Sequence, residues 1–341
     1  MAGAQNHRLA LAVCQAGGLG ALPAAMLSPD ALQAELQALT AATPAPYNVN
    51  FFCHAQPTPN AEREAGWHKA LAPYYSEFGL DASPMPGGPG RVPFGHDSAD
   101  VLEVFRPAVV SFHFGLPAPD LLARVKSWGA FVLSSATTVA EARWLQAHGA
   151  DAVIAQGLEA GGHRGMFLTD DLSTQMGTFA LLPQIVQAVD VPVIAAGGVG
   201  TDQAVAAALQ LGASGVQIGT AYLCSHEAGT SALHRAALQS PAAQHTALTT
   251  LFSGRPARGI VNRLMRELGP VNEAAPAFPL ATAAIAPLRA AAEAQGLSDF
   301  TPLWSGQNAS SARSLSATEI TRDWVQAWLG ASLHEGMGVG A

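Results

Sequence analysis

The sequence is short of charged residues. Lysine, arginine, aspartate and glutamate make up only 12% of its 341 residues, the formal net charge is −8, and no basic cluster occurs. Because binding to a phosphate backbone needs concentrated Lys and Arg, we expect no nucleic-acid partner. No apolar run approaches the roughly 18 residues of a membrane span. Met1 is not followed by the basic stretch and apolar core of an export signal. We therefore expect no membrane association.

Cysteine is scarce as well. Cys14, Cys53 and Cys224 lie far apart without a Cys-x-x-Cys pair, and an odd count resists a disulfide framework, which indicates a cytoplasmic protein. Apolar residues, by contrast, make up 49% of the chain, and there are 34 glycines. This composition favours a compact protein with a large buried core over a disordered chain.

Seven short apolar runs recur along the chain, and most are followed by a segment with helix-start signals. Their apolarity is continuous rather than alternating, which is typical of strands buried on both faces. We expect strands within residues 18–23, 47–53, 108–115, 130–137, 150–157, 191–199 and 214–223. Thr138 with Glu141 predicts a capping box for one following helix, and Thr201 predicts the N-cap of another.

Seven strands with crossover helices leave two α/β architectures, a doubly wound open sheet or a (β/α)8 TIM-type barrel. Glycines cluster at the ends of the last two strands, where barrels often hold phosphate, and this favours the barrel. The eighth strand would have to come first. There the sequence passes from a few small residues straight into a helical pattern, so we expect strand 1 to be short or truncated.

Two regions interrupt the strand–helix rhythm. Residues 54–100 are rich in Pro and Gly, and we expect a loop excursion with one or two helices, one near 62–78, that forms a wall or lid of the site. After Cys224, segments rich in Ala, Leu and Arg indicate mainly helical structure. We therefore divide the chain into a barrel, residues 1–224, and a mainly helical C-terminal region, residues 225–341, that completes the site and the barrel exterior.

The strand ends predict a binding site, since all strands of a barrel deliver their last residues to one face. These residues are Asn50, His113, Gln156, the Gly197-Gly198 pair and the Gly219-Thr220 pair. Amide side chains suit the mixed edges of a flat heterocycle, and glycine N–H groups near helix starts bind phosphate without a lysine. FMN is the natural candidate. The Gly-Gly pair can equally serve only a tight turn, and Asn50 can equally satisfy a loop carbonyl.

The stretch QGLEAGGHRGMF, residues 156–167, places His163 among four glycines. We expect these glycines to keep side chains off a cofactor, in an irregular loop where no core uses the imidazole. No second ligand stands at metal-binding spacing, so no metal is expected. An imidazole that titrates near neutrality suits proton removal from carbon or recognition of an anion.

The remaining histidines are less informative. His113 lies within an apolar run and is an even choice between a hydrogen-bonded core histidine and a site residue. Five others in polar or helical contexts, His234 among them, are expected at the surface.

At QGLEAGGHRG and PVIAAGGVGTDQAVAAALQLGASGVQIGTAYL the sequence resembles the nitronate monooxygenase family, formerly named 2-nitropropane dioxygenases. The likeness covers most of the chain, and SFHFGLP, FSGRPARG and LWSGQ point to class I. It implies a flavin-dependent monooxygenase with FMN that oxidises alkyl nitronates, such as propionate 3-nitronate, with O2 in a detoxifying role. Members of the family carry a strand that ends in Pro-Met and is followed by Ala-Gly. Here only Met1-Ala2-Gly3 stand at that position. This departs from the family's usual strand 1 and from the usual place of Met1 beside the flavin.

By motif match, His163 corresponds to the catalytic histidine of the family. The FMN contacts that the resemblance implies are Asn50, Gln156, Gly161, Gly198 and the run Gln217, Ile218, Gly219 and Thr220. As a mechanistic hypothesis, a nitronate gives one electron to FMN, and the flavin semiquinone reacts with O2 on the way to a carbonyl compound and nitrite. His163 would deprotonate neutral nitroalkanes or, when protonated, hold the anion.

Other functions fit the same features. An FMN-dependent enoyl-thioester (enoyl-ACP) reductase resembles this superfamily down to its own EAGGH loop, and an NAD(P)H:quinone reductase is a further option. A barrel that binds flavin or phosphate without catalysis belongs to a different class. A flavin that is bleached anaerobically by nitronate, but not by NADH or NADPH, would separate these functions.

Overall fold

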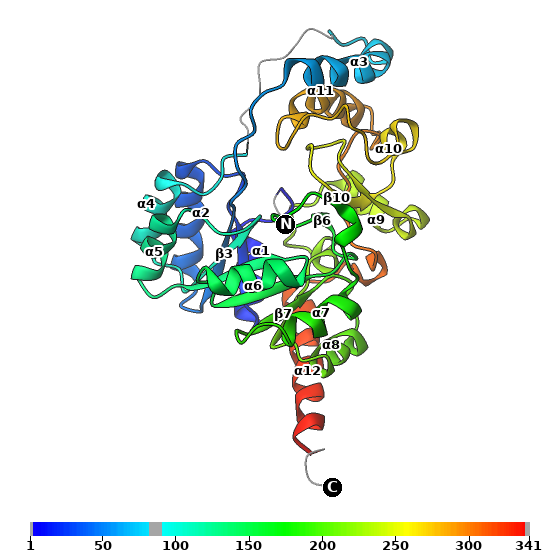
Figure 1. The fold of residues 1–341 in the computed structure, drawn as a ribbon. Helices are drawn as coiled ribbons and strands as arrows, with labels where there is room; N and C mark the ends of the chain where they lie inside the picture. The colour runs from blue at the N-terminus through cyan, green and yellow to red at the C-terminus, as the bar shows by residue number, and fades with distance from the viewer. Residues whose placement is uncertain (1–2, 82–90, 338–341) are drawn as a thin grey trace.

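A computed structural model describes residues 3–81 and 91–337 of the chain. At its centre lies a seven-stranded sheet in the order β1-β2-β3-β4-β5-β7-β8, with every neighbouring pair parallel, curled into a half-barrel (Figure 1). The strands are β1 (Gly20–Pro23), β2 (Tyr47–Phe52), β3 (Val109–His113), β4 (Phe131–Ala136), β5 (Ala152–Gln156), β7 (Val193–Ala196) and β8 (Gly215–Gln217). Each lies within one of the seven runs expected from the sequence, so these strand predictions are confirmed.

Helices cover the outside of the sheet. They are α1 (His7–Gln15), α2 (Pro29–Ala42), α4 (His96–Phe105), α5 (Pro119–Ser127), α6 (Val139–Ala147), α7 (Thr178–Val186) and α8 (Asp202–Gln210). The central strands are buried on both faces, as Val49, Phe112 and Val153 illustrate with side chains fully removed from solvent. This two-sided burial explains why their sequences are apolar without alternation.

The predicted helix caps are confirmed in part. The hydroxyls of Thr138 and Thr201 accept hydrogen bonds from the N–H groups of Glu141 and Ala204, both at 3.2 Å. The capping box is wrong, however, because the Glu141 carboxylate does not return to the Thr138 N–H. It accepts instead from the N–H and the hydroxyl of Thr137, both at 2.7 Å.

The first strand of a complete barrel is missing from the described chain, as the sequence predicts. No strand precedes β1 among residues 3–6, and β1 and β8 are the two edges of the sheet. The side-chain amide of Gln5 donates to the Ala21 carbonyl on the free edge of β1, and the Gly229 N–H donates to the Ala4 carbonyl at 2.9 Å. Residue 5 thus contacts the free edge of β1, and residue 4 contacts the segment that precedes α9. The expected place of Met1 lies outside the described residues.

The excursion at residues 54–100 contains α3 (Ala61–Glu77), close to the helix predicted near 62–78, and the start of α4. Helix α3 packs against α11 (Ala281–Ala294), in a lobe set apart from the sheet (Figure 1). Two side chains of α3 bind the backbone of α11: Trp67 Nε1 donates to the Ala281 carbonyl at 3.3 Å, and the Tyr75 hydroxyl donates to the Ala284 carbonyl at 2.7 Å. The excursion is therefore anchored on the C-terminal region.

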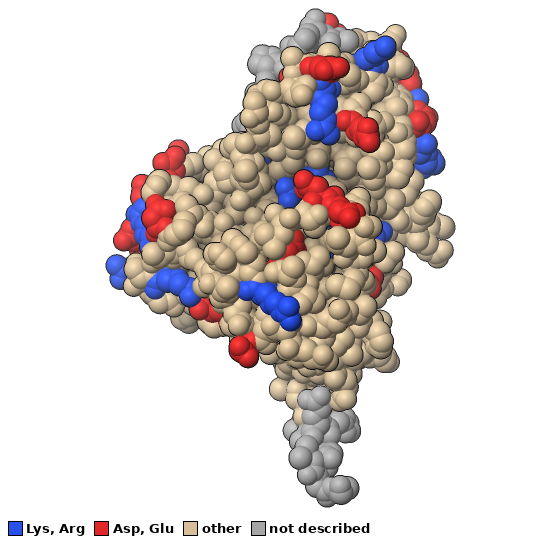
Figure 2. All heavy atoms as spheres, in the orientation of Figure 1, with Lys and Arg blue, Asp and Glu red and all other residues tan. Residues whose placement is uncertain are grey.

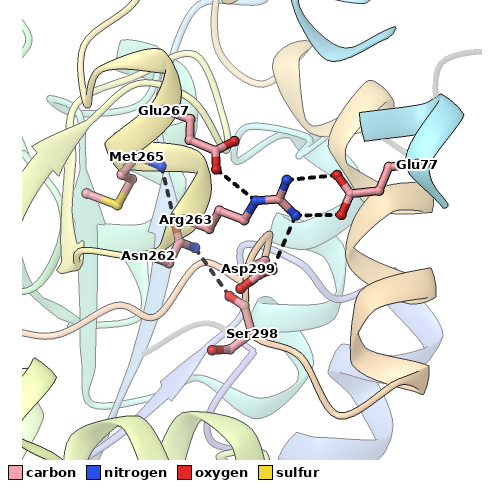
Figure 3. Close-up of polar contacts among 7 residues, drawn as sticks. All are labelled: Glu77, Asn262, Arg263, Met265, Glu267, Ser298 and Asp299. Atoms are coloured by element: carbon pink, nitrogen blue, oxygen red, sulfur yellow. Dashed lines mark hydrogen bonds and ion pairs between the residues drawn. The ribbon is translucent and has the colours of Figure 1, made fainter. Parts of the chain in front are cut away.

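Arg263, the first residue of α10 (Arg263–Leu268), links α10 to α3 in this lobe (Figure 3). Its guanidinium makes two hydrogen bonds of 2.7 Å to Glu77 at the end of α3, one of 2.9 Å to Glu267, and lies 3.7 Å from Asp299. Asn262 caps α10 by accepting from the Met265 N–H. A two-pronged arginine–carboxylate pair fixes the orientation of both helices, although each exposed pair adds little stability.

The C-terminal residues add two strands to a mainly helical region. The further elements are α9 (Ala232–Leu238), β9 (Thr246–Thr249), β10 (Ala257–Ile260) and α12 (Ala317–Met337). Strand β10 pairs antiparallel with β9 and with β6 (Gly162–His163), and α12 packs on α8 and α1. None of the helices in the described ranges is long and apolar enough to cross a membrane. On the face in Figure 2, Lys and Arg lie singly among Asp and Glu on a mainly uncharged surface.

Candidate active site

His163 does not lie in an irregular loop, contrary to the expectation from its glycines. Gly162 and His163 form β6, which pairs with Ala257 and Arg258 of β10, and the Arg164 N–H donates to the Pro256 carbonyl at 2.9 Å. A long-range strand pairing thus fixes the backbone of this segment. The FSGRPARG motif supplies the partner strand, which explains why the two motifs occur together.

Among the described residues, the imidazole of His163 has one polar contact and four aromatic neighbours. Its Nε2 lies 2.8 Å from the Ser253 hydroxyl. The ring centroids of Phe52, Phe114, Phe278 and Trp304 lie 5.2–6.1 Å from that of the imidazole. The ring is therefore held between a hydroxyl and apolar walls. These walls come from β2, the end of β3 and the C-terminal region.

Gln156 and His113 hold the carbonyl of His163. Gln156 Nε2 donates to this carbonyl at 2.9 Å, and Gln156 Oε1 accepts from the Gly165 N–H at 2.7 Å. His113 Nε2 lies 3.2 Å from the same carbonyl, and its Nδ1 lies 3.0 Å from the Ser135 hydroxyl. Because a carbonyl only accepts, His113 Nε2 carries the proton and Nδ1 accepts from Ser135. His113 is thus a hydrogen-bonded histidine that holds the His163 carbonyl, and its role as a site residue stays a prediction.

Both histidines are kept neutral. Burial lowers the pKa of His113 to about 3, and burial lowers the pKa of His163 well below its usual value. The charges of Arg91 and Arg255 lower the pKa of His163 further. Removal from water disfavours the charged imidazole, and nearby cations add to this effect. His163 therefore presents a neutral ring that is a weaker base than a free imidazole, so the expectation that it titrates near neutrality is wrong for this structure.

Two buried charged residues that sequence reasoning missed support the same segment. The guanidinium of Arg164 donates to the carbonyls of Gly157 at 2.6 Å and Gln156 at 2.7 Å, and to Gln175 Oε1 at 3.0 Å. Glu141 Oε1 accepts from the N–H of Phe167 at 2.6 Å. Both side chains are fully buried. The sequence signal that could have indicated a role for Arg164 is its position as a charged residue inside a glycine-rich motif. Glu141 gave no such signal, because its position suggested a helix-capping residue.

Most of the glycines around His163 make room for protein atoms, and the expectation that they also keep side chains off a cofactor stays a prediction. A Cβ at Gly161 would lie 2.5 Å from the Gly306 nitrogen, one at Gly165 would lie 2.9 Å from His113 Cε1, and one at Gly157 would overlap Thr178. Only at Gly162, with φ of +74°, would a Cβ meet open space. Any contact between the Gly161 backbone and FMN remains a prediction.

The ends of β7 and β8 present free backbone donors. Within the described ranges, no protein acceptor takes the N–H of Gly198, Gly219 or Thr220. The segment after Trp304 contacts both strand ends, because the Gly306 N–H donates to Thr220 Oγ1 at 2.9 Å and Asn308 Nδ2 donates to the Gly198 carbonyl at 3.1 Å. Free N–H groups close to the starts of α8 and the 3-10 turn Thr220–Tyr222 fit an anionic group such as phosphate.

The other predicted contacts lie at or near strand ends. Asn50 does not end its strand as expected, because β2 continues to Phe52; it is partly exposed, and its Nδ2 donates to Ser111 Oγ at 2.8 Å. Gln217 and Ile218 lie at the end of the edge strand β8, with Gln217 exposed beside the gap in the barrel. The structure therefore gathers the predicted residues at the carboxyl ends of the parallel strands. Their binding to FMN stays a prediction.

Three further residues near His163 escaped sequence reasoning, namely His54, Arg91 and Arg255. The Arg255 guanidinium lies 4.2 Å above the Phe114 ring, and that of Arg91 lies 5.4 Å from the Phe278 ring. His54 Nε2 lies 3.0 Å from the Arg91 carbonyl. Their spacing in the sequence does not predict that these residues lie close together. They meet only because the excursion and the C-terminal region fold onto the sheet.

Comparison with known proteins agrees with this geometry. A family model described as "Nitronate monooxygenase" matches residues 1–327. The chain is 40% identical over 329 residues to a nitronate monooxygenase of Pseudomonas aeruginosa (96% of this chain, 93% of that one), and 40% identical over 324 residues to one of Paraburkholderia phytofirmans (94% and 88%).

Among solved structures, a nitroalkane oxidase from Streptomyces ansochromogenes superposes with a TM-score of 0.89 at 38% identity, covering 98% of this chain and 95% of that one. The family is one of flavin-dependent oxidoreductases, and the curled parallel sheet of this chain is TIM-barrel-like. With a match that spans nearly its whole length, the chain belongs to the nitronate monooxygenase family.

Proposed function

We propose that this chain is an FMN-dependent nitronate monooxygenase that uses O2 to convert alkyl nitronates, and neutral nitroalkanes, into a carbonyl compound and nitrite. One observation carries the proposal: the neutral imidazole of His163 is held against Ser253 at the same face of the barrel as the free N–H groups of β7 and β8. The printed description of the Streptomyces structure as a nitroalkane oxidase supports the substrate class.

The residues at the strand ends suit FMN. The N–H groups of Gly198, Gly219 and Thr220 would take its phosphate, since they have no acceptor among the described residues. Asn50 and Gln156 would meet the edges of the ring, with the backbones of Gly161, Gln217 and Ile218 alongside. Gln156 retains one Nε2 hydrogen and one Oε1 lone pair beyond its bonds to His163 and Gly165. When bound, FMN would supply the electron-accepting group for the redox step.

His163 would act as the base for neutral nitroalkanes. The Ser253 hydroxyl lies 2.8 Å from His163 Nε2 and 3.4 Å from the Arg255 carbonyl, to which it can donate. In that arrangement Nε2–H donates to Ser253, and the lone pair of Nδ1 remains available for a carbon-bound proton. The carbonyl bonds from Gln156 and His113 keep the ring in place while the proton moves to Nδ1.

Both parts of the chain contribute to the proposed site. In our division, residues 1–224 carry the flavin and residues 225–341 complete the substrate side. Ser253 and Trp304, which contact His163 from beyond residue 225, support this division. The proposed partners are small molecules, a nitronate and O2.

Product analysis tests the function. The flavin-loaded protein should consume O2 and release nitrite and an aldehyde or ketone from alkyl nitronates, without NADH or NADPH. An enoyl-thioester reductase would instead oxidise a nicotinamide only with an enoyl thioester present, and a quinone reductase only with a quinone. Turnover of either of those pairs without nitrite from any nitronate would refute the proposal. No turnover of any kind would favour a non-catalytic flavin-binding barrel.

A further inference from the structure

The bridging segment, residues 305–308, contacts the chain just beyond both β7 and β8. Asn308 Nδ2 donates to the Gly198 carbonyl, after β7, at 3.1 Å. The Gly306 N–H donates to Thr220 Oγ1, after β8, at 2.9 Å. A short piece of the C-terminal region thus holds one acceptor at each of the two strand ends where the free backbone donors lie.

Close packing fixes the bridging segment against these ends. A Cβ at Gly200 would lie 2.7 Å from Asn308 Nδ2, and one at Gly161 would lie 2.5 Å from the Gly306 nitrogen. A Cβ at Gly306 itself would lie 2.8 Å from the Glu159 carbonyl oxygen. Because none of the three positions has room for a side chain, the segment lies directly on the neighbouring backbone, and its atoms cannot shift without moving the strand ends.

The amide of Asn308 is held in one orientation and sets the direction of a peptide group. Its Oδ1 accepts from the Ser310 hydroxyl at 3.0 Å, so Nδ2 is the atom that faces the Gly198 carbonyl. This carbonyl belongs to the trans peptide between Gly198 and Val199. In a trans peptide the N–H points away from the C=O. The Val199 N–H therefore points away from Asn308, and no acceptor in the described ranges takes it.

The contact from Gly306 has a similar effect on Thr220. Its hydroxyl oxygen accepts from the Gly306 N–H, and among the described residues no acceptor takes the hydroxyl proton. Since the accepted bond occupies one side of the oxygen, the O–H is left to donate elsewhere. The end of β8 thus offers this O–H in addition to the free N–H groups of Gly219 and Thr220.

Neutral groups supply the donors at both strand ends: the N–H groups of Gly198, Val199, Gly219 and Thr220 and the hydroxyl of Thr220. An anion bound there is held by oriented dipoles, without the attraction of a lysine or arginine side chain among these residues. A hydrogen bond weakens steeply as it departs from linearity. The groups that set the directions of these donors therefore determine how tightly they bind an anion.

We propose that the bridging segment positions the donors at the ends of β7 and β8 for a phosphate monoester, with Asn308 as the positioning residue on the β7 side. The inference rests on the proposed function, in which the phosphate of FMN lies at these donors. Asn308 acts through the peptide between Gly198 and Val199. On the β8 side, the Gly306 N–H acts through the hydroxyl of Thr220, which would itself contact the phosphate.

FMN and riboflavin isolate the phosphate, because riboflavin has the same ring and ribityl chain without it. Flavin fluorescence released on dilution of the loaded full-length protein gives Kd for FMN, and competition gives Kd for riboflavin. The wild type should bind FMN more tightly. Asn308→Leu, a side chain of similar shape without the donor, should raise Kd for FMN by about 10-fold and leave Kd for riboflavin unchanged.

Further variants separate positioning from folding. Asn308→Asp keeps the shape and the acceptor for Ser310, but its carboxylate cannot donate and repels the phosphate, so Kd for FMN should rise more than in Asn308→Leu. Thr220→Val should raise Kd for FMN, and Thr220→Ser should restore it. Asn272→Leu is the matched control, since Asn272 Nδ2 also donates to a backbone carbonyl, that of Leu268 at 3.0 Å, in the lobe of α10.

The outcomes distinguish the two proposals. A preference for FMN that Asn308→Leu leaves unchanged, or an equal rise of Kd for both flavins, would overturn the positioning role and keep the proposed function. A wild type that binds both flavins equally would overturn the phosphate placement on which both proposals rest. A preference for FMN that falls in the Asn308 and Thr220 variants, in a protein that oxidises no nitronate, would keep the positioning role and overturn the proposed activity.

Discussion

Nε2 of His163 lies 2.8 Å from the hydroxyl oxygen of Ser253, a residue 90 positions further along the chain. The contact exists because β6 and β10 pair, which brings the turn before β10 against the histidine. When the Ser253 hydroxyl donates to the Arg255 carbonyl, 3.4 Å away, it accepts from His163, and the imidazole proton then lies on Nε2. The chemistry proposed for the barrel thus depends on a turn in the C-terminal region.

Replacing Ser253 by Ala should therefore slow the oxidation of neutral nitroalkanes more than that of nitronates. Loss of one hydrogen bond to the base should cost about 10-fold in kcat/KM for the nitroalkane, because the Nε2 proton is no longer held. Steady-state assays with a nitroalkane and its pre-formed nitronate would measure the difference in kcat/KM between the two substrates. Ser127→Ala, an exposed serine that binds only the Arg124 carbonyl, is the control. An unchanged nitroalkane rate would argue against the proposed proton position.

His163→Asn should abolish nitroalkane turnover and leave much of the nitronate activity. Asparagine can still hydrogen-bond to Ser253, but it cannot accept a proton from carbon near neutral pH. The same pair of substrates measures the effect. An equal loss on both would show that His163 does not act as a general base.

Gly161→Ala and Gly66→Ala should change stability in opposite directions. The new Cβ at position 161 would lie 2.5 Å from the Gly306 nitrogen, and relieving this overlap should lower the free energy of unfolding by about 1–3 kcal/mol. Position 66 lies within α3 with open space around it, so alanine should raise stability by about 0.5–1 kcal/mol. Urea unfolding measures both. An unchanged free energy of unfolding in Gly161→Ala would contradict the tight contact between the His163 segment and residues 305–306.

Stability should fall as the pH drops below about 6.5, the usual pKa of histidine in an unfolded chain. Burial lowers the pKa of His54 and His234 to about 4, that of His113 to about 3, and that of His163 well below its usual value. The unfolded chain then takes up protons that the folded chain does not. Each histidine therefore lowers the free energy of unfolding by up to about 1.4 kcal/mol per pH unit, until its folded pKa is reached.

Urea midpoints between pH 7.5 and pH 5 measure this slope. His234→Gln should make it shallower by one histidine's share, since glutamine can still donate to the Trp304 carbonyl that His234 Nε2 binds at 3.1 Å. His96→Gln, at a side chain 71% exposed, is the control. Stability that stays constant over this range would contradict the burial of these rings. His234 is itself a correction, because the sequence placed it at the surface and the structure buries it.

The parts of the fold that depend on local sequence could be predicted. Continuous apolar runs identified all seven strands, and Thr138 and Thr201 identified two helix starts, because burial on both faces and capping leave a mark within a few residues. The helix of the excursion, α3, was found for the same reason. The lack of a strand among residues 3–6 agrees with the short or truncated first strand that the residues before α1 predict.

The parts that depend on distant contacts could not be predicted. β6 is only two residues long and exists through its pairing with β10, so no local pattern marks it. Glu141 and Arg164 are buried charges whose partners are backbone groups elsewhere in the chain. Arg91 and Arg255 meet around His163 only after the excursion and the C-terminal region have folded onto the sheet.

The central claim is that nitronate, rather than a nicotinamide, delivers electrons to a flavin held beside His163. Its most direct test is the visible absorbance of the bound flavin without oxygen. The account predicts that the purified protein is yellow, that propionate 3-nitronate bleaches it, and that neither NADH nor NADPH does. Bleaching by a nicotinamide with no response to nitronate, or a protein that cannot be loaded with FMN, would contradict it.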